Sequence, residues 1–241
     1  MLLSVVIPSY KASVALANNV PGLISYLHQK EYAFEIVIVD DGSEDNSATE
    51  KVANDLHCIF LKNEKNLGKG AAIKKGMLHA KGDFRIFTDA DIPFEYDAFD
   101  RFIEYLNAKE FGIVVGDRTL PGSNYFTEIS PIRKLGSNVF SFIVGRFIAG
   151  GYFDTQCGMK GFRAAIANDL FSVNRINGFA FDVEILYIAL KRNYDIKRLP
   201  VVLRSQEGSS VSLLRHAFGM LMDLFKIKQN HVRGLYEKAT K

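Results

Sequence analysis

The sequence predicts an α/β fold built around a mostly parallel central sheet, and two observations carry this prediction. Short apolar runs rich in β-branched residues recur along the chain, and polar, proline or glycine residues follow them. Segments with helical periodicity separate these runs. Strands that are apolar along their whole length and alternate with helices are typical of parallel strands covered on both faces.

The individual elements follow from the same two patterns. Predicted strands occupy residues 3–7, 35–39, 58–61, 84–88, 112–115 and 196–203. Predicted helices occupy residues 13–29, 46–56, 69–80, 95–108, 131–149, 180–192 and 211–228. The length of 241 residues and the lack of a Pro/Gly/Ser-rich linker fit one domain at 1–210, followed by an amphipathic helical extension at 211–241.

The composition excludes several classes of protein. The formal net charge is only +3, so a nucleic-acid binder is not expected, because such proteins carry a clustered basic face. Two cysteines are too few for a disulfide framework, and a reducing cytoplasmic environment is expected. No signal peptide is expected, because the first predicted strand starts within the first residues of the sequence. No transmembrane helix is expected, because no apolar stretch reaches the roughly 20 residues that span a bilayer.

Acidic side chains follow two of the predicted strands, and a proline and a tyrosine follow a third. These residues are Pro8, Tyr10, Asp40, Asp41, Asp89 and Asp91. The carboxyl ends of parallel strands meet at one edge, where ligands bind in open α/β sheets. Carboxylates gathered there repel one another unless they are paired or bind a cation. Hard oxygen ligands select Mg²⁺ or Mn²⁺, and we predict this metal at Asp89 and Asp91. The alternative is that the acids only stabilise turns and helix ends.

Two common nucleotide-binding motifs are absent. No Gly-x-Gly-x-x-Gly follows the first predicted strand, and residues 67–71 lack the flanking residues of a phosphate loop. Gly68 and Gly70 nevertheless begin a predicted helix, where backbone N–H groups are expected to approach a ligand. A simple helix start explains these glycines equally well.

Several motifs together resemble glycosyltransferase family 2: VIPSY at 6–10, VDDGSEDNS at 39–47, NLGKG at 66–70 and TDAD at 88–91. The segments DTQCGMKGF at 154–162 and GFAFDVE at 178–184 are similar to the polyprenyl-phosphate glycosyltransferases. Within that group the resemblance is closest to the dolichyl-phosphate β-glucosyltransferase branch, with the mannose synthases as cousins. The resemblance implies a glycosyltransferase-A fold and transfer with inversion from a UDP- or GDP-linked sugar.

The same resemblance implies a role for each matching residue. The residues expected around the base and ribose are Pro8, Tyr10, Asp41 and Lys69, with Asp40 close behind them. Those expected to face the phosphates of donor or acceptor are Arg118, Arg133 and Lys134. Asp89 is expected near the ribose, and Asp91 is expected to hold the Mg²⁺ or Mn²⁺ that bridges the diphosphate.

The chemistry of the acceptor affects which side chains are needed. A phosphate monoester is already anionic near neutral pH, so it needs cations more than a base. Arg133 and Lys134 supply these cations, unless they form a solvated helix face. Asp182 is expected to be a catalytic residue on the acceptor side, as a base or an orienting group. Glu184 is expected to pair with a nearby cation, unless it only favours the helix N-terminus.

Several functions fit these features. The leading hypothesis is transfer of glucose from UDP-glucose to a polyprenyl phosphate by a protein bound peripherally to the inner face of the membrane. Helix 211–228 would then lie on the bilayer, although a helix packed into the core or a dimer interface fits its pattern as well. The other hypotheses are a soluble or polysaccharide acceptor, a sugar nucleotidyltransferase and a catalytically silent nucleotide-binding module.

Overall fold

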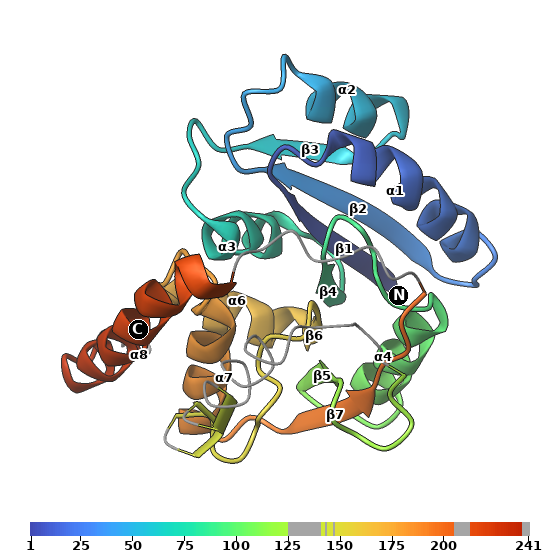
Figure 1. The fold of residues 1–241 in the computed structure, drawn as a ribbon. Helices are drawn as coiled ribbons and strands as arrows, with labels where there is room; N and C mark the ends of the chain where they lie inside the picture. Colours follow the sequence, from blue (N-terminus) through green and yellow to red (C-terminus); the bar gives the residue numbers. More distant parts are fainter. Residues whose placement is uncertain (125–140, 143, 147, 205–212, 238–241) are drawn as a thin grey trace.

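The computed structural model describes the chain apart from residues 125–140, 143, 147, 205–212 and 238–241. A seven-stranded sheet forms its centre, in the order β3-β2-β1-β4-β6-β5-β7 (Figure 1). The strands are β1 Leu2–Ser9, β2 Ala33–Asp40, β3 Ile59–Lys62, β4 Phe84–Thr88, β5 Ile113–Asp117, β6 Met159–Arg163 and β7 Ile196–Pro200. All neighbouring pairs are parallel except those of β6 with β4 and β5, so the predicted mostly parallel sheet is confirmed.

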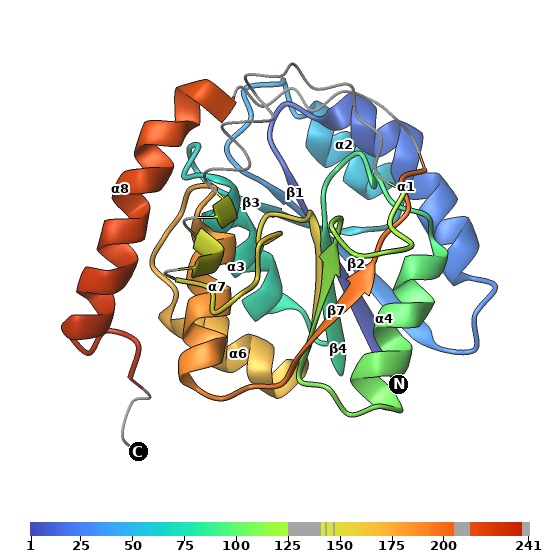
Figure 2. The same ribbon diagram turned by 60° about the horizontal axis from the view of Figure 1, so that its bottom comes forward.

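Helices cover both faces of the sheet (Figure 2). On one face lie α1 Ser13–Leu27, α2 Ala48–Asp55 and α4 Asp97–Asn107, and on the other lie α3 Lys69–His79, α6 Ala164–Val173 and α7 Phe181–Lys191. Alternate residues of one strand enter different cores: Val5 and Ile7 face the first set, whereas Val6 faces the second. Burial on both faces explains why these strands are apolar throughout.

The sequence patterns missed β6 and α6. Strand β6 contains Lys160 and Gly161 and therefore lacks a continuous apolar run. Gly161 is closely packed, because a Cβ there would lie 3.0 Å from Phe102 Cδ1 and 3.1 Å from Leu106 Cδ1, and these side chains would have to shift by a few tenths of an ångström. Lys160 is fully buried. A glycine and a charged side chain thus fill core positions, which hydrophobic periodicity does not detect.

The last described helix, α8 Leu213–Val232, packs beside α7. Leu224, Ile227 and the following Tyr236 are buried in the same core cluster as α3, α6 and α7. Leu221, Met222 and Phe225 are exposed on the helix. Among the described residues, no helix is long and apolar enough to cross a membrane. Most of the predicted helix 131–149 lies outside the described residues, and residues 141, 142 and 144–146 are helical.

Candidate active site

The predicted acids meet at the carboxyl edge of β1, β2 and β4. Strands β1 and β2 end level with each other, with Ser9 opposite Asp40, and the backbone N–H of Asp41 donates to Ser9 O at 2.8 Å. Strand β4 pairs with the other side of β1 and ends one residue before Asp89. The topology therefore brings both acidic segments to one edge.

Asp40 and Asp41 are buried and hold the loops around this edge. Both oxygens of Asp40 accept the backbone N–H of Ser43 at 3.2 Å. Asp41 accepts hydrogen bonds from Asn63 Nδ2 at 2.8 Å and from the backbone N–H of Gly68 at 2.7 Å. These are the turn contacts that the alternative interpretation expects. Contacts of Asp40 and Asp41 with a nucleotide stay a prediction.

The loop held by Asp41 leads directly into α3, which begins at Lys69. The backbone N–H of Gly68 is bonded to Asp41, and that of Gly70 donates to Asn177 O at 2.7 Å. Both N–H groups are thus used inside the protein. The expectation that they approach a ligand is wrong for this arrangement.

Lys69 and Asp89 form an ion pair at the centre of the edge, with Nζ and Oδ1 2.5 Å apart. Burial alone would lower the pKa of Lys69, but the nearby carboxylates of Asp89, Asp182 and Asp91 outweigh it and raise that pKa. Lys69 therefore stays protonated, and the site contains a fixed positive charge beside its acids.

The turn after β4 presents Asp89 and Asp91. It is closed by a hydrogen bond from the backbone N–H of Ile92 to Asp89 O at 3.0 Å. Ile92 is buried and has a φ of 40°, a left-handed conformation that is rare for a β-branched residue. Such strained backbone concentrates at functional sites, because surrounding packing must maintain it.

Asp89 and Asp91 fit a site for Mg²⁺ or Mn²⁺. Both are half-buried, and a Cβ at Gly158 would overlap Asp89 Oδ2, so glycine leaves room for this carboxylate. Within the described part of the chain no cluster of three or more acidic, histidine or cysteine side chains could hold a metal. Mg²⁺ commonly binds through one or two carboxylates, with phosphates and water completing its shell.

Beneath Lys69 lies a buried ion pair that the sequence did not reveal. Lys160 Nζ donates to Asp182 Oδ1 at 2.6 Å and to Cys157 O at 2.9 Å. Lys160 is fully buried and Asp182 is 4% exposed. Burial raises the pKa of Asp182, while Lys160 and then Lys69 oppose that rise. The only sequence signal for Lys160 was its place in the DTQCGMKGF segment.

The other predicted residues lie at the end of β1, outside the described residues, or in contacts away from the acidic edge. Pro8 is half-buried and Tyr10 is 47% exposed, both at the end of β1. Arg133 and Lys134 lie outside the described residues. Glu184 has a cation near it, because Lys74 opposes the rise that burial causes in its pKa. The hydrogen bonds to its carboxylate come instead from two backbone N–H groups and the hydroxyl of Tyr236.

Arg118, expected to face phosphates, is paired with Asp154 in the structure. Its guanidinium donates to both carboxylate oxygens, at 2.9 and 2.6 Å, and its backbone N–H donates at 2.7 Å. Burial alone would raise the pKa of Asp154, but these contacts with Arg118 outweigh it and lower that pKa. Arg118 thereby joins the end of β5 to the segment that precedes β6.

We expect Arg118→Met to lower the free energy of unfolding by ~2 kcal/mol at neutral pH, the usual scale for charged hydrogen bonds. Because the folded-state pKa of Asp154 lies below its ordinary value of 3.8, this stabilisation is complete above that value and is lost as pH falls through the folded-state pKa. Urea unfolding at pH 7, 5 and 3 measures the free energy of unfolding of the variant and of wild type. The difference between these two free energies should be smaller at pH 3 than at pH 7. The control is Arg101→Met, whose partner Asp97 is largely exposed. A pH-independent difference would contradict this account.

Comparison with known proteins identifies the family. The model for glycosyl transferase family 2 matches residues 4–171. A dolichyl-phosphate beta-glucosyltransferase of Dictyostelium discoideum is 31% identical, covering 98% of this chain and 76% of the relative. The human dolichyl-phosphate beta-glucosyltransferase is 30% identical, covering 97% of this chain and 77% of the relative.

Solved structures show the same fold at low sequence identity. Glucosyl-3-phosphoglycerate synthase from Mycobacterium tuberculosis, in complex with Mn²⁺, UDP-glucose and phosphoglyceric acid, aligns with a TM-score of 0.71 at 17% identity, covering 94% of this chain and 79% of that one. Mannosyl-3-phosphoglycerate synthase from Rubrobacter xylanophilus aligns with a TM-score of 0.72 at 16% identity, covering all of this chain and 77% of that one. The M. tuberculosis synthase has also been crystallised with Mg²⁺ and UDP.

The predicted glycosyltransferase-A fold is confirmed by these likenesses. The family model covers more than half of the chain, and the relatives align over nearly all of it. The chain therefore belongs to glycosyltransferase family 2.

Proposed function

We propose that this glycosyltransferase transfers glucose from UDP-glucose to a polyprenyl phosphate such as dolichyl phosphate, with inversion at the anomeric carbon. The observation that carries the proposal is the cluster of Lys69, Asp89 and Asp91 at the carboxyl edge of the sheet. A nucleoside diphosphate needs positive charge beside its phosphates, and this edge supplies both a lysine and metal-binding acids. The names of the relatives support the choice of sugar and acceptor.

Each residue of the site has its own role in this proposal. Asp89 and Asp91 would hold Mg²⁺ or Mn²⁺, which when bound neutralises the negative charge on the departing diphosphate. Lys69 adds a fixed positive charge on the nucleotide side. Asp182, which is paired with buried Lys160, adds a negative charge close enough to Lys69 to help raise its pKa. The phosphate acceptor attacks without losing a proton, so no general base is required.

Donor and acceptor specificity test the proposal directly. We expect glucose transfer from UDP-glucose to dolichyl phosphate in the presence of Mn²⁺, with release of UDP. GDP-mannose serves as the donor control. Dolichol without its phosphate and 3-phosphoglycerate serve as acceptor controls. Transfer to 3-phosphoglycerate but not to dolichyl phosphate would overturn the lipid acceptor, and release of pyrophosphate would indicate a nucleotidyltransferase.

A lipid acceptor requires contact with a membrane surface, and α8 offers the side chains for it. Phe225 is 72% exposed, and Leu221 and Met222 are exposed near it. Lys226, one residue after Phe225, is exposed but paired with Asp223 at 2.8 Å, and Lys228 and Arg233 are exposed cations further along the chain. Apolar side chains with neighbouring cations are typical of helices that lie on anionic membranes. We therefore place the protein peripherally on the cytoplasmic face of a membrane, with residues 211–241 as the contacting extension of the catalytic domain at 1–210.

We expect Phe225→Glu to reduce binding to vesicles of phosphatidylcholine and phosphatidylserine by about tenfold, because a charge replaces an aromatic ring at the interface. Flotation of the protein with these vesicles measures the effect. Val14→Glu is a matched control, since Val14 is also 72% exposed but lies in α1 on the other face of the sheet (Figure 2). Equal retention of both variants would contradict a role for α8.

A further inference from the structure

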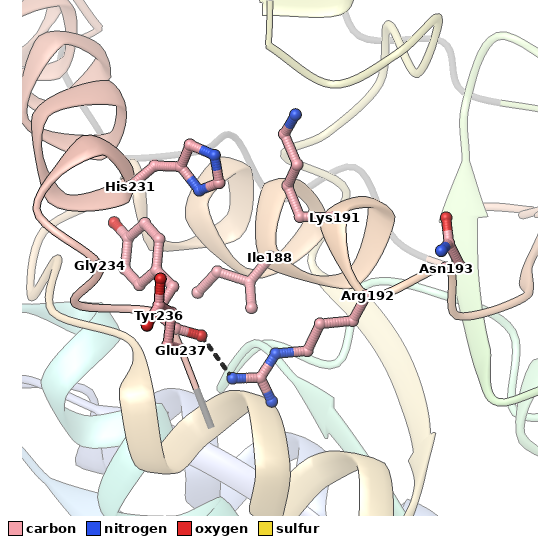
Figure 3. Close-up of a pocket in the computed structure, with 8 residues that line it drawn as sticks. All are labelled: Ile188, Lys191, Arg192, Asn193, His231, Gly234, Tyr236 and Glu237. Atoms are coloured by element: carbon pink, nitrogen blue, oxygen red, sulfur yellow. Dashed lines mark hydrogen bonds between the residues drawn. The ribbon is translucent and has the colours of Figure 1, made fainter. Parts of the chain in front are cut away.

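The segment after α8 is fastened to the core through Tyr236. Its hydroxyl donates to Glu184 Oε1 at 2.5 Å, and Arg192 donates to its backbone carbonyl at 2.7 Å. Figure 3 shows Tyr236 beside Arg192 and Ile188, at the wall of a cavity of about 450 Å³. Burial and then the bond to Glu184 raise the pKa of Tyr236, so the hydroxyl keeps its proton and remains a donor.

Glu184 links Tyr236 to the turn between α6 and α7. Its second oxygen accepts the backbone N–H groups of Arg175 at 2.9 Å and Ile176 at 2.7 Å. Glu184 is fully buried in α7. One carboxylate thus holds the hydroxyl of Tyr236 with one oxygen and the backbone of the turn with the other.

The turn closes directly on the N-terminus of α3, the helix that begins at Lys69. The carbonyl of Asn177 accepts the backbone N–H groups of Gly70 at 2.7 Å and Ala71 at 3.2 Å. The turn and α3 are closely packed here, because a Cβ at Gly70 would lie 2.6 Å from Phe181 Cβ and 2.9 Å from Asn177 O. A displacement of the turn would therefore displace the first turn of α3.

We propose that Tyr236 is a positioning residue, which acts through Glu184 and the turn at Asn177 to keep Lys69 against Asp89 at the nucleotide site. The inference rests on the proposed role of Lys69, but it concerns a residue far from that site in sequence. A tyrosine that only fastens the end of the chain would leave the first turn of α3 unaffected when its hydroxyl is removed.

Tyr236→Phe tests the proposal, because it removes the hydroxyl and keeps the ring. Amide hydrogen exchange of Gly70 and Ala71 should become about three- to tenfold faster, and the Kd for UDP with Mn²⁺ should rise by a similar factor. Tyr26→Phe is the matched control, since the hydroxyl of Tyr26 also donates to a carboxylate at 2.5 Å, on the opposite face of the sheet. It should change neither quantity. Melting temperatures of both variants report any general loss of stability.

Unchanged exchange at Gly70 and Ala71 in Tyr236→Phe would overturn the proposal, as would equal changes in both variants. Asn230→Ala is a milder second variant, because Asn230 Nδ2 donates to the Tyr236 hydroxyl at 3.2 Å and helps to orient it. It should produce a smaller change of the same sign. If wild type does not bind UDP at all, the proposed function fails, whereas the exchange rates still decide whether Tyr236 positions α3.

Discussion

Replacing Asp91 with alanine is expected to lower kcat/KM for glucose transfer from UDP-glucose by at least about 1000-fold. Asp91 follows β4 in the turn that also carries Asp89, at the edge where the strands end. Its removal would halve the carboxylates available to a divalent cation and leave the charge of the departing diphosphate poorly compensated. Steady-state rates of UDP release, measured over a titration of Mn²⁺, check this expectation.

Binding measurements separate a loss of metal from a loss of fold. Wild type should bind UDP more tightly when Mn²⁺ is present, and the variant should lose this gain while keeping its metal-free affinity. Asp97→Ala is the control, because Asp97 is an exposed acid at the start of α4. It should turn over like wild type. Full activity of the Asp91 variant would remove the basis for the metal's place in the proposal.

The sheet and its acidic edge were predictable because both depend on local sequence. Strands buried on both faces need nearly continuous apolar runs, and such runs indicate β1, β2 and β4 directly. Parallel pairing then brings Asp41 and Asp89 to one edge without further information. Lys69 was found through a motif, and the structure places its ammonium on Asp89.

The contacts that hold this edge in place were not predictable, because they join residues distant in sequence or use backbone groups. Lys160 and Asp182 are 22 residues apart, and nothing in either segment specifies the other. Asn177 acts through its carbonyl, which every residue possesses. Glu184 has Lys74 near it, but two backbone N–H groups and a tyrosine hydroxyl donate the hydrogen bonds to its carboxylate. Chain topology decides such partners, and hydrophobic periodicity does not report them.

Replacing Lys160 with methionine is expected to lower the free energy of unfolding by about 3–5 kcal/mol, because it removes the cation that is hydrogen-bonded to the buried carboxylate of Asp182. The double variant Lys160→Met/Asp182→Leu should recover much of that loss, since apolar side chains can replace a buried ion pair. Denaturation in urea at pH 7 measures both. Recovery of stability without recovery of transfer would indicate that Asp182 serves the active site, where it lies close enough to raise the pKa of Lys69.

The ion pair between Lys30 and Asp100 provides the comparison that isolates burial. It has the same length of 2.6 Å, but its lysine side chain is 27% exposed, whereas that of Lys160 is fully buried. Lys30→Met should therefore cost far less stability, because water can solvate the carboxylate that remains. Equal losses for the two lysines would mean that ion-pair geometry, rather than desolvation of Asp182, determines the cost. A stable Lys160→Met variant with normal transfer would show that neither the fold nor Lys69 depends on the buried pair.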